Sequence, residues 1–140
     1  MSQTLKLLRE HSDAIRAHGR ETYPHECYGF LLGAQGEGAV TEVARASNAR
    51  VDSPSNRYLI PPEEFVRVQR DADRSGLEIV GFYHSHPDHP ARPSAFDRDH
   101  AWPGYAYLIA EVVGGEPRAL NGFRLAAVGG TFDEIPLEEA

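Results

Sequence analysis

The chain has very little cysteine, no cluster of basic residues and no long apolar run. Cys27 is the only cysteine among 140 residues, which excludes an internal disulfide and a zinc site built from several thiolates. Lysine and arginine number 14 against 21 aspartates and glutamates, so the net charge is −7. Because such a surface repels a phosphate backbone, we expect no nucleic acid as a partner. Any metal site must rely mainly on histidine and carboxylate side chains.

Long apolar segments are also missing. The longest runs, such as residues 105–113, reach about half of the roughly 20 residues that cross a bilayer. Residues 1–10 lack the apolar core of a signal peptide. We therefore expect no membrane partner and a location in the cytoplasm. With 41% hydrophobic residues, 25% charged residues and no repeat or low-complexity linker, residues 1–140 are predicted to form a single domain.

The hydrophobic pattern changes between helical and extended periodicity along the chain. Helical patterns cover residues 8–20, ended by Gly19 and Pro24, and residues 61–74, ended by Ser75 and Gly76. A short helix is expected at residues 94–100. Strands are predicted at 4–7, 28–34, 40–46, 57–60, 77–83, 105–113, 120–128 and 131–135, with turns at 35–38 and 129–130. This order predicts a mixed α/β fold whose helices cover a mainly antiparallel sheet, with 77–83 as a central strand.

The segment after this central strand carries residues that ligate metals. In an extended chain, side chains two positions apart point to the same side, so His84 and His86 can present both imidazoles to one point. The prolines that follow restrict the loop, and a stiff loop can return Asp97 to the same point. Three protein ligands leave the fourth position of a zinc ion open to water, as in catalytic rather than structural sites.

Hydrolysis at such a site also needs a carboxylate that is not a ligand, to accept a proton from the attacking water. Glu26, at the start of an apolar strand, is the best candidate for this general base. Ser94 carries a hydroxyl that could donate to the developing oxyanion. Ser94 and Asp97 also match a capping box that opens a helix, and both interpretations can hold together.

Together these residues resemble the JAMM metalloprotease motif of the MPN domain family. The spacing is His84-Ser85-His86-Pro87, six further residues, then Ser94-x-x-Asp97, with Glu26 upstream. The resemblance spans nearly all of the chain. It implies a fold similar to cytidine deaminase, with a curved sheet between helices. It also implies one zinc ion per chain held by the two histidines and the aspartate, Glu26 as general base and Ser94 as oxyanion donor.

The length of the chain makes it similar to the compact bacterial members of this family. These are associated with ubiquitin-like sulfur-carrier proteins that end in Gly-Gly. The resemblance therefore implies a zinc-dependent peptidase or isopeptidase that hydrolyses the bond after the Gly-Gly of such a carrier. Many of these members have Cys-Cys-Gly or Ala-Cys-Gly after the glutamate, whereas this chain has Cys27-Tyr28-Gly29.

Other interpretations of the same residues stay open. The chain could be a non-catalytic MPN scaffold, although scaffold members usually lack the ligands, or a metal-dependent hydrolase of a nucleotide or nucleic acid. The net charge of −7 and the missing P-C-x-x-C segment of deaminases argue against the latter. Cys27 is predicted to be an inert buried residue rather than a nucleophile, and His89 a loop residue without a ligand role. The acidic residues Asp133, Glu134, Glu138 and Glu139 are predicted to form a solvated end.

Overall fold

The computed structural model describes residues 4–34, 36, 38–46, 62–125 and 131–140. Within them the helices are α1 (Arg9–Thr22), α2 (Pro62–Arg74) and α3 (Ala95–His100). The strands are β1 (Leu5–Leu7), β2 (Tyr28–Gly33), β3 (Glu42–Arg45), β4 (Glu78–Pro87), β5 (Ala106–Val113), β6 (Glu116–Leu125), β7 (Phe132–Ile135) and β8 (Leu137–Glu139). No helix in these described segments is both long and apolar enough to cross a membrane.

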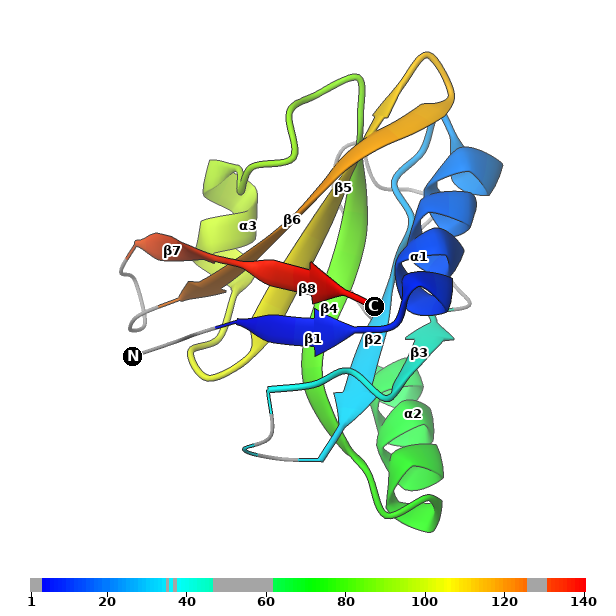
Figure 1. The fold of residues 1–140 in the computed structure, drawn as a ribbon, viewed down its shortest axis with the longest axis vertical. Coiled ribbons are helices and arrows are strands. Elements are labelled where there is room, and N and C mark those ends of the chain that lie inside the picture. Colours follow the sequence, from blue (N-terminus) through cyan, green and yellow to red (C-terminus); the bar gives the residue numbers. More distant parts are fainter. Residues whose placement is uncertain (1–3, 35, 37, 47–61, 126–130) are drawn as a thin grey trace.

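One six-stranded sheet organises the molecule, in the order β3-β2-β4-β5-β6-β7 (Figure 1). Every neighbouring pair is antiparallel except β4 and β5, which run parallel. The connection between these two strands carries α3. The predicted mixed α/β fold with a mainly antiparallel sheet is therefore confirmed, and so is the central position of the strand that leads into the histidines.

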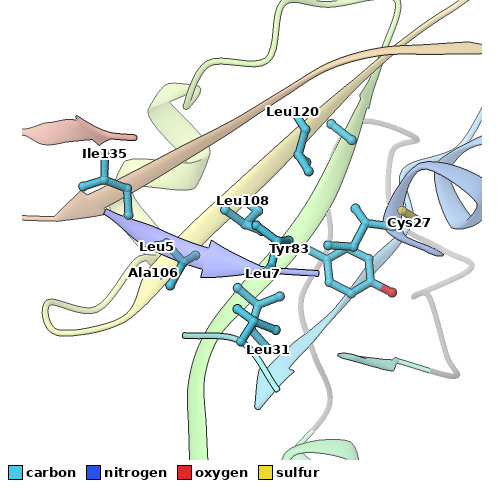
Figure 2. Close-up of a cluster of buried hydrophobic side chains, with 12 residues drawn as sticks. Leu5, Leu7, Cys27, Leu31, Tyr83, Ala106, Leu108, Leu120 and Ile135 are labelled. Atoms are coloured by element: carbon cyan, nitrogen blue, oxygen red, sulfur yellow. The ribbon is translucent and has the colours of Figure 1, made fainter. Parts of the chain in front are cut away.

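The two faces of the sheet bury different side chains of the same strand. On one face, Tyr83 belongs to a core cluster with residues of α1 and β1, part of which Figure 2 shows. On the other face, Phe82 packs in a cluster that includes Val68 and Ala72 of α2. Because side chains alternate along a strand, His84 and His86 share the α2 face with Phe82, whereas Ser85 shares the α1 face with Tyr83.

Gly19 does not end the first helix, contrary to the sequence prediction. Helix α1 continues through it to Thr22. A Cβ atom at position 19 would lie 2.9 Å from Val112 Cγ2 and 3.3 Å from Ser85 Cβ. Glycine is therefore needed here because α1 approaches the sheet closely, and the helix ends only before Pro24.

The predicted solvated end of acidic residues is part of a strand: Glu138 and Glu139 lie in β8, which pairs in parallel with β1, so that Leu137 is opposite Leu5. Glu138 is exposed as predicted, whereas Glu139 is half-buried. Glu139 Oε1 lies 3.3 Å from Arg16 Nη1 of α1. Asp133 and Glu134 are exposed, but they belong to β7. The predicted strand at 57–60 and turn at 129–130 lie outside the described residues.

Gly29 is expected to be essential for the stability of the sheet. An added Cβ at this position of β2 would press on the Tyr83 ring and lie 2.5 Å from the Ala44 carbonyl oxygen. Neither neighbour can move freely, because one is a buried ring and the other is backbone. We expect Gly29→Ala to lower the free energy of unfolding by about 3 kcal/mol, measured by urea denaturation. Glu42→Ala, an exposed change on the paired strand β3, should stay within about 0.5 kcal/mol; equal midpoints for the two variants would contradict this packing argument.

Candidate metal centre

His84 and His86 lie within β4 itself, which runs to Pro87 rather than ending before the histidines. His84 is held between Tyr28 of β2 and Ile109 of β5 in the sheet register. The Nε2 atoms of the two histidines are 3.1 Å apart. Only 1% of His84 and 6% of His86 is exposed. The central strand therefore holds both rings in a buried, converging arrangement.

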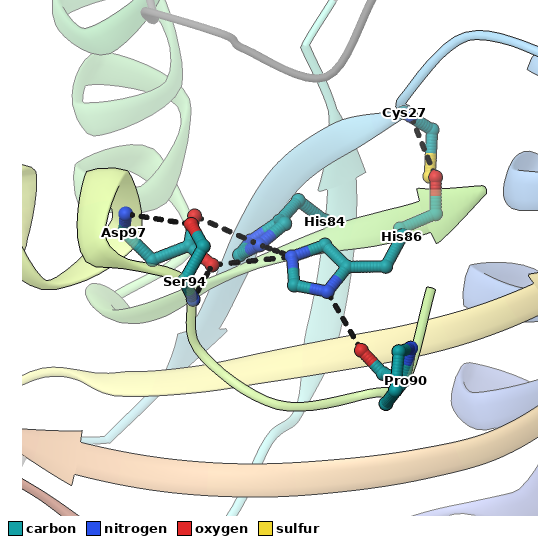
Figure 3. A network of polar contacts seen from close by, with 7 residues as sticks. Cys27, His84, His86, Pro90, Ser94 and Asp97 are labelled. Atoms are coloured by element: carbon teal, nitrogen blue, oxygen red, sulfur yellow. Dashed lines mark hydrogen bonds and ion pairs between the residues drawn. The ribbon is translucent and has the colours of Figure 1, made fainter. Parts of the chain in front are cut away.

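Asp97 reaches the same point from the first turn of α3, as Figure 3 shows. Its Oδ1 lies 3.3 Å from His84 Nε2, and its Oδ2 lies 3.1 Å from His86 Nε2. Ser94 caps the helix: its backbone N–H donates to Asp97 Oδ2 at 2.8 Å, and its Oγ accepts from the Asp97 N–H at 3.1 Å. The capping box is therefore present, and it also orients the carboxylate toward the histidines.

The hydrogen bonding of His86 shows why this group fits a cation. His86 Nδ1 lies 2.8 Å from the Pro90 carbonyl oxygen, which only accepts hydrogen bonds, so Nδ1 carries the proton of the neutral ring. Its Nε2 then presents a lone pair to Asp97, another acceptor, and to His84 Nε2. Acceptors that face one another at this distance need a proton or a metal ion between them. One atom from each of the three residues, all within 4.8 Å of one another, could ligate a metal, and two imidazoles with a carboxylate are ligands typical of zinc.

The electrostatics of the cluster keep its carboxylate ionised. Burial lowers the pKa of His84. Burial also acts to lower the pKa of His86, but the charged ring can donate from Nε2 to Asp97 as well as from Nδ1 to Pro90, which outweighs burial, and the pKa is raised. For Asp97, burial acts to raise the pKa, and the hydrogen bonds that protonated His84 and His86 donate to it instead hold it well below its usual range. Asp97 is therefore an anion at neutral pH, as a metal ligand must be.

Glu26 lies beside the cluster without a hydrogen-bond partner for one of its carboxylate oxygens. Tyr28 pairs with His84 in antiparallel register, so Glu26, two residues earlier, is level with His86 and on the same face of the sheet. Its side chain is buried, with 8% of the residue exposed, and Oε1 has no partner among the described residues. Its pKa is raised to about 8, mainly by burial; the charge of His86 acts to lower this pKa and that of Asp97 acts to raise it. This carboxyl is placed to exchange protons next to the cluster.

Ser85 is a residue of the site that the sequence analysis did not identify. It is fully buried on the opposite face of the sheet, where its Oγ accepts from the Cys27 N–H at 2.8 Å and its own N–H donates to the Cys27 carbonyl at 3.1 Å. The backbone next to Glu26 is thus attached to the backbone between the two histidines. The feature of the sequence that could have identified Ser85 is the presence of a serine inside an apolar strand. Burial raises the pKa of the Cys27 thiol to about 12, in keeping with an inert residue.

Asp88 is a second residue that the sequence analysis missed. Its Oδ2 accepts from the Tyr23 hydroxyl at 2.7 Å and its Oδ1 from the Gly114 N–H at 2.8 Å. This carboxylate therefore connects the loop after the histidines to the segment that precedes Glu26 and to the turn between β5 and β6. Its φ of 59° lies in the left-handed region, which aspartate tolerates better than most residues. The neighbouring His89 is exposed and is not part of the cluster of possible ligands.

A cluster that could hold a cation on the central strand of an α/β sheet, with a buried carboxylate beside it, is an arrangement typical of metal-dependent hydrolases. The chain belongs to the family described as prokaryotic homologs of the JAB domain, whose model matches residues 8–125. It is thus a compact JAMM-type hydrolase of the peptidase and isopeptidase class. The predicted family and enzyme class are confirmed.

Individual relatives agree with this assignment. The chain is 40% identical over 113 residues to a desampylase of Haloferax volcanii, covering 77% of this chain and 81% of that protein. It is 33% identical over 97 residues to a probable TtuB-protein conjugate cleaving protease of Thermus thermophilus, covering 69% of this chain and 63% of that protein. A JAB1/MPN domain protein from Archaeoglobus fulgidus has the same fold, with a TM-score of 0.60 at 18% identity and coverage of 98% of both chains.

Proposed function

We propose that this protein is a zinc-dependent isopeptidase that hydrolyses the peptide or isopeptide bond after the C-terminal Gly-Gly of a ubiquitin-like sulfur-carrier protein. The observation that carries the proposal is the convergence of His84, His86 and Asp97 beside the buried Glu26. Two relatives support the substrate class, since one is named a desampylase and the other a protease that cleaves protein conjugates. The single domain over residues 1–140 and the cytoplasmic location stay predictions.

The ligands in this proposal are the Nε2 atoms of the two histidines and the carboxylate of Asp97, with one zinc ion per chain. When bound, zinc would polarise the scissile carbonyl and lower the pKa of the attacking water to about 7. The hydrogen bond between His86 Nδ1 and the Pro90 carbonyl holds that ring in the tautomer whose Nε2 faces the cluster. The capping box around Ser94 holds the Asp97 carboxylate in place.

Glu26 and Ser94 have separate roles in this proposal. Glu26 accepts the proton of the attacking water and passes it to the leaving amine, which its unpartnered oxygen and its raised pKa support. The Ser94 Oγ accepts from the Asp97 N–H, which leaves its own O–H free to donate. That O–H stabilises the oxyanion that forms on the scissile carbonyl. A hydroxyl can cap the helix and donate at the same time, so the two functions of Ser94 do not compete.

The burial of the cluster supports a substrate with small residues before the scissile bond. The two histidines are almost fully buried, and the Asp97 side chain is 9% exposed. When a scissile carbonyl approaches such buried ligands, the substrate residues before it must have small side chains. A Gly-Gly tail provides a flexible, extended segment without side chains.

Cleavage of a carrier conjugate tests this function directly. A carrier extended by a few residues after its Gly-Gly, or joined to a lysine, is incubated with the zinc-loaded enzyme, and the products are identified by mass spectrometry. We expect release at the glycine carboxyl. We also expect the change of the last glycine of the carrier to valine to reduce the rate by at least about 100-fold, since one misplaced reacting carbonyl has an effect of this size. An uncut carrier, together with efficient cleavage of unrelated peptides, would overturn the carrier assignment.

A further inference from the structure

A surface depression of about 390 Å³ adjoins the candidate metal centre on the side of Ser94. Its walls come from the loop after β4, from α3 and from strands β6 and β7. Ser94 is part of both features, since it lines the depression and donates its N–H to Asp97. Successive residues of an extended chain advance about 3.3 Å, so a substrate that crosses Ser94 enters the depression within one or two residues of the scissile bond.

The depression is built on fixed parts of the fold. Its apolar floor includes Phe123, of which 6% is exposed, and Phe132, and these rings meet edge to face with centroids 6.3 Å apart. The Asn121 side chain donates to the Ala91 carbonyl at 3.1 Å and so attaches the loop to β6. Ala91 is itself buried against Phe123. The shape of the depression therefore does not depend on a free loop.

The charge of this depression is opposite to that of the whole chain. Arg92 and Arg98 line it and are exposed, with Glu134 of β7 as the acidic residue of its lining. Within the described part of the chain, neither arginine has a side-chain hydrogen bond or an ion pair. In a protein with a net charge of −7, two unpaired guanidinium groups next to an apolar floor favour a carboxylate with an aliphatic stem.

We propose that this depression, which we call the arginine subsite (Arg92, Arg98, Phe123 and Phe132), binds an acidic side chain of the protein substrate within three residues of the scissile bond. The methylenes of that side chain lie on the two phenylalanine rings, and its carboxylate pairs with the arginines. The proposal rests on the proposed function, because it takes the scissile bond to lie at the metal centre. It adds a preference in sequence around that bond to the requirement for Gly-Gly.

Matched substrates test the subsite. Model conjugates that all keep Gly-Gly before the scissile bond, and that differ only by Glu or Gln at one position, are cut by the zinc-loaded protein. The position is either the residue before Gly-Gly or one of the three residues after the scissile bond. We expect kcat/KM to be about two- to fivefold higher for Glu at one of these positions, mainly through KM, since exposed pairs with arginine have effects of this size. The double variant Arg92→Gln with Arg98→Gln should lose this preference. Arg20→Gln, an exposed change on the opposite face of the sheet, should keep it.

Binding without turnover separates this proposal from the proposed function. Labelled Glu and Gln peptides are titrated with Glu26→Gln protein by fluorescence anisotropy, with and without the two arginine changes. Tighter binding of the Glu peptide that disappears with the arginine changes supports the subsite, even if no conjugate is cut. Equal binding and equal cleavage of Glu and Gln substrates at every position, or a preference that survives the double variant, overturns the subsite and leaves the isopeptidase proposal intact.

Discussion

Glu26→Gln is expected to lower kcat by about 10²- to 10⁴-fold, the range typical of a lost general acid and base, while the protein keeps its zinc. Glutamine has nearly the same shape, so the fold is preserved, but it cannot accept the proton of the attacking water. The carboxyl is buried, and its Oε1 has no partner among the described residues, so no hydrogen bond seen at that atom is lost. Elemental analysis should therefore show an unchanged zinc content, while the rate of conjugate cleavage falls.

The same variant has a second readout in the metal-free protein. Burial raises the pKa of Glu26 from 4.5 to about 8, so the folded chain holds this proton more tightly than the unfolded chain. The resulting stabilisation is complete below pH 4.5 and is lost as the pH rises to about 8. Glu26→Gln lacks this dependence. As the pH rises from 4.5 to about 8, the free energy of unfolding of the wild type should therefore fall relative to that of the variant. Loss of zinc from the variant would make Glu26 a ligand, and near-normal turnover would exclude it as the base.

Removal of either histidine is expected to abolish both metal binding and activity. His84→Ala or His86→Ala takes away one of the three proposed ligands and leaves Asp97 ionised in a buried position. The zinc affinity should fall by more than about 100-fold, because losing even a residue that only supports a ligand costs 10- to 100-fold. Bound zinc, measured after dialysis, should fall from about one per chain to a trace, and a chelator should stop turnover by the wild type.

His89→Ala is the matched control for these variants. His89 lies three residues after His86 in the same loop but is exposed and outside the cluster. We expect it to keep its zinc and its turnover. Stoichiometric zinc in both the His84 and His86 variants would show that the ligand assignment is wrong, whereas loss of zinc from the His89 variant would add that residue to the site.

The sequence could predict those parts of the site that depend on local geometry. The extended backbone alone brings His84 and His86 to one side, and the prolines with the capping box around Ser94 favour the return of Asp97. The alternation of apolar segments predicted the central strand and the order of the helices for the same reason, since these patterns arise from neighbours along the chain. Glu26 could be proposed because an acid at the start of an apolar strand is unusual.

Contacts between distant segments were decided only by the tertiary structure. No local pattern shows that Gly19 approaches Val112, that β8 pairs with β1, or that β4 and β5 run parallel. The hydrogen bonds of Ser85 and Asp88 join residues 58 and 65 positions apart, so their roles are invisible before the chain is folded. The spacing of the proposed ligands is local, so it can be recognised in the sequence. The position of the proposed base Glu26 and the walls of the proposed arginine subsite depend instead on which strands become neighbours in the sheet.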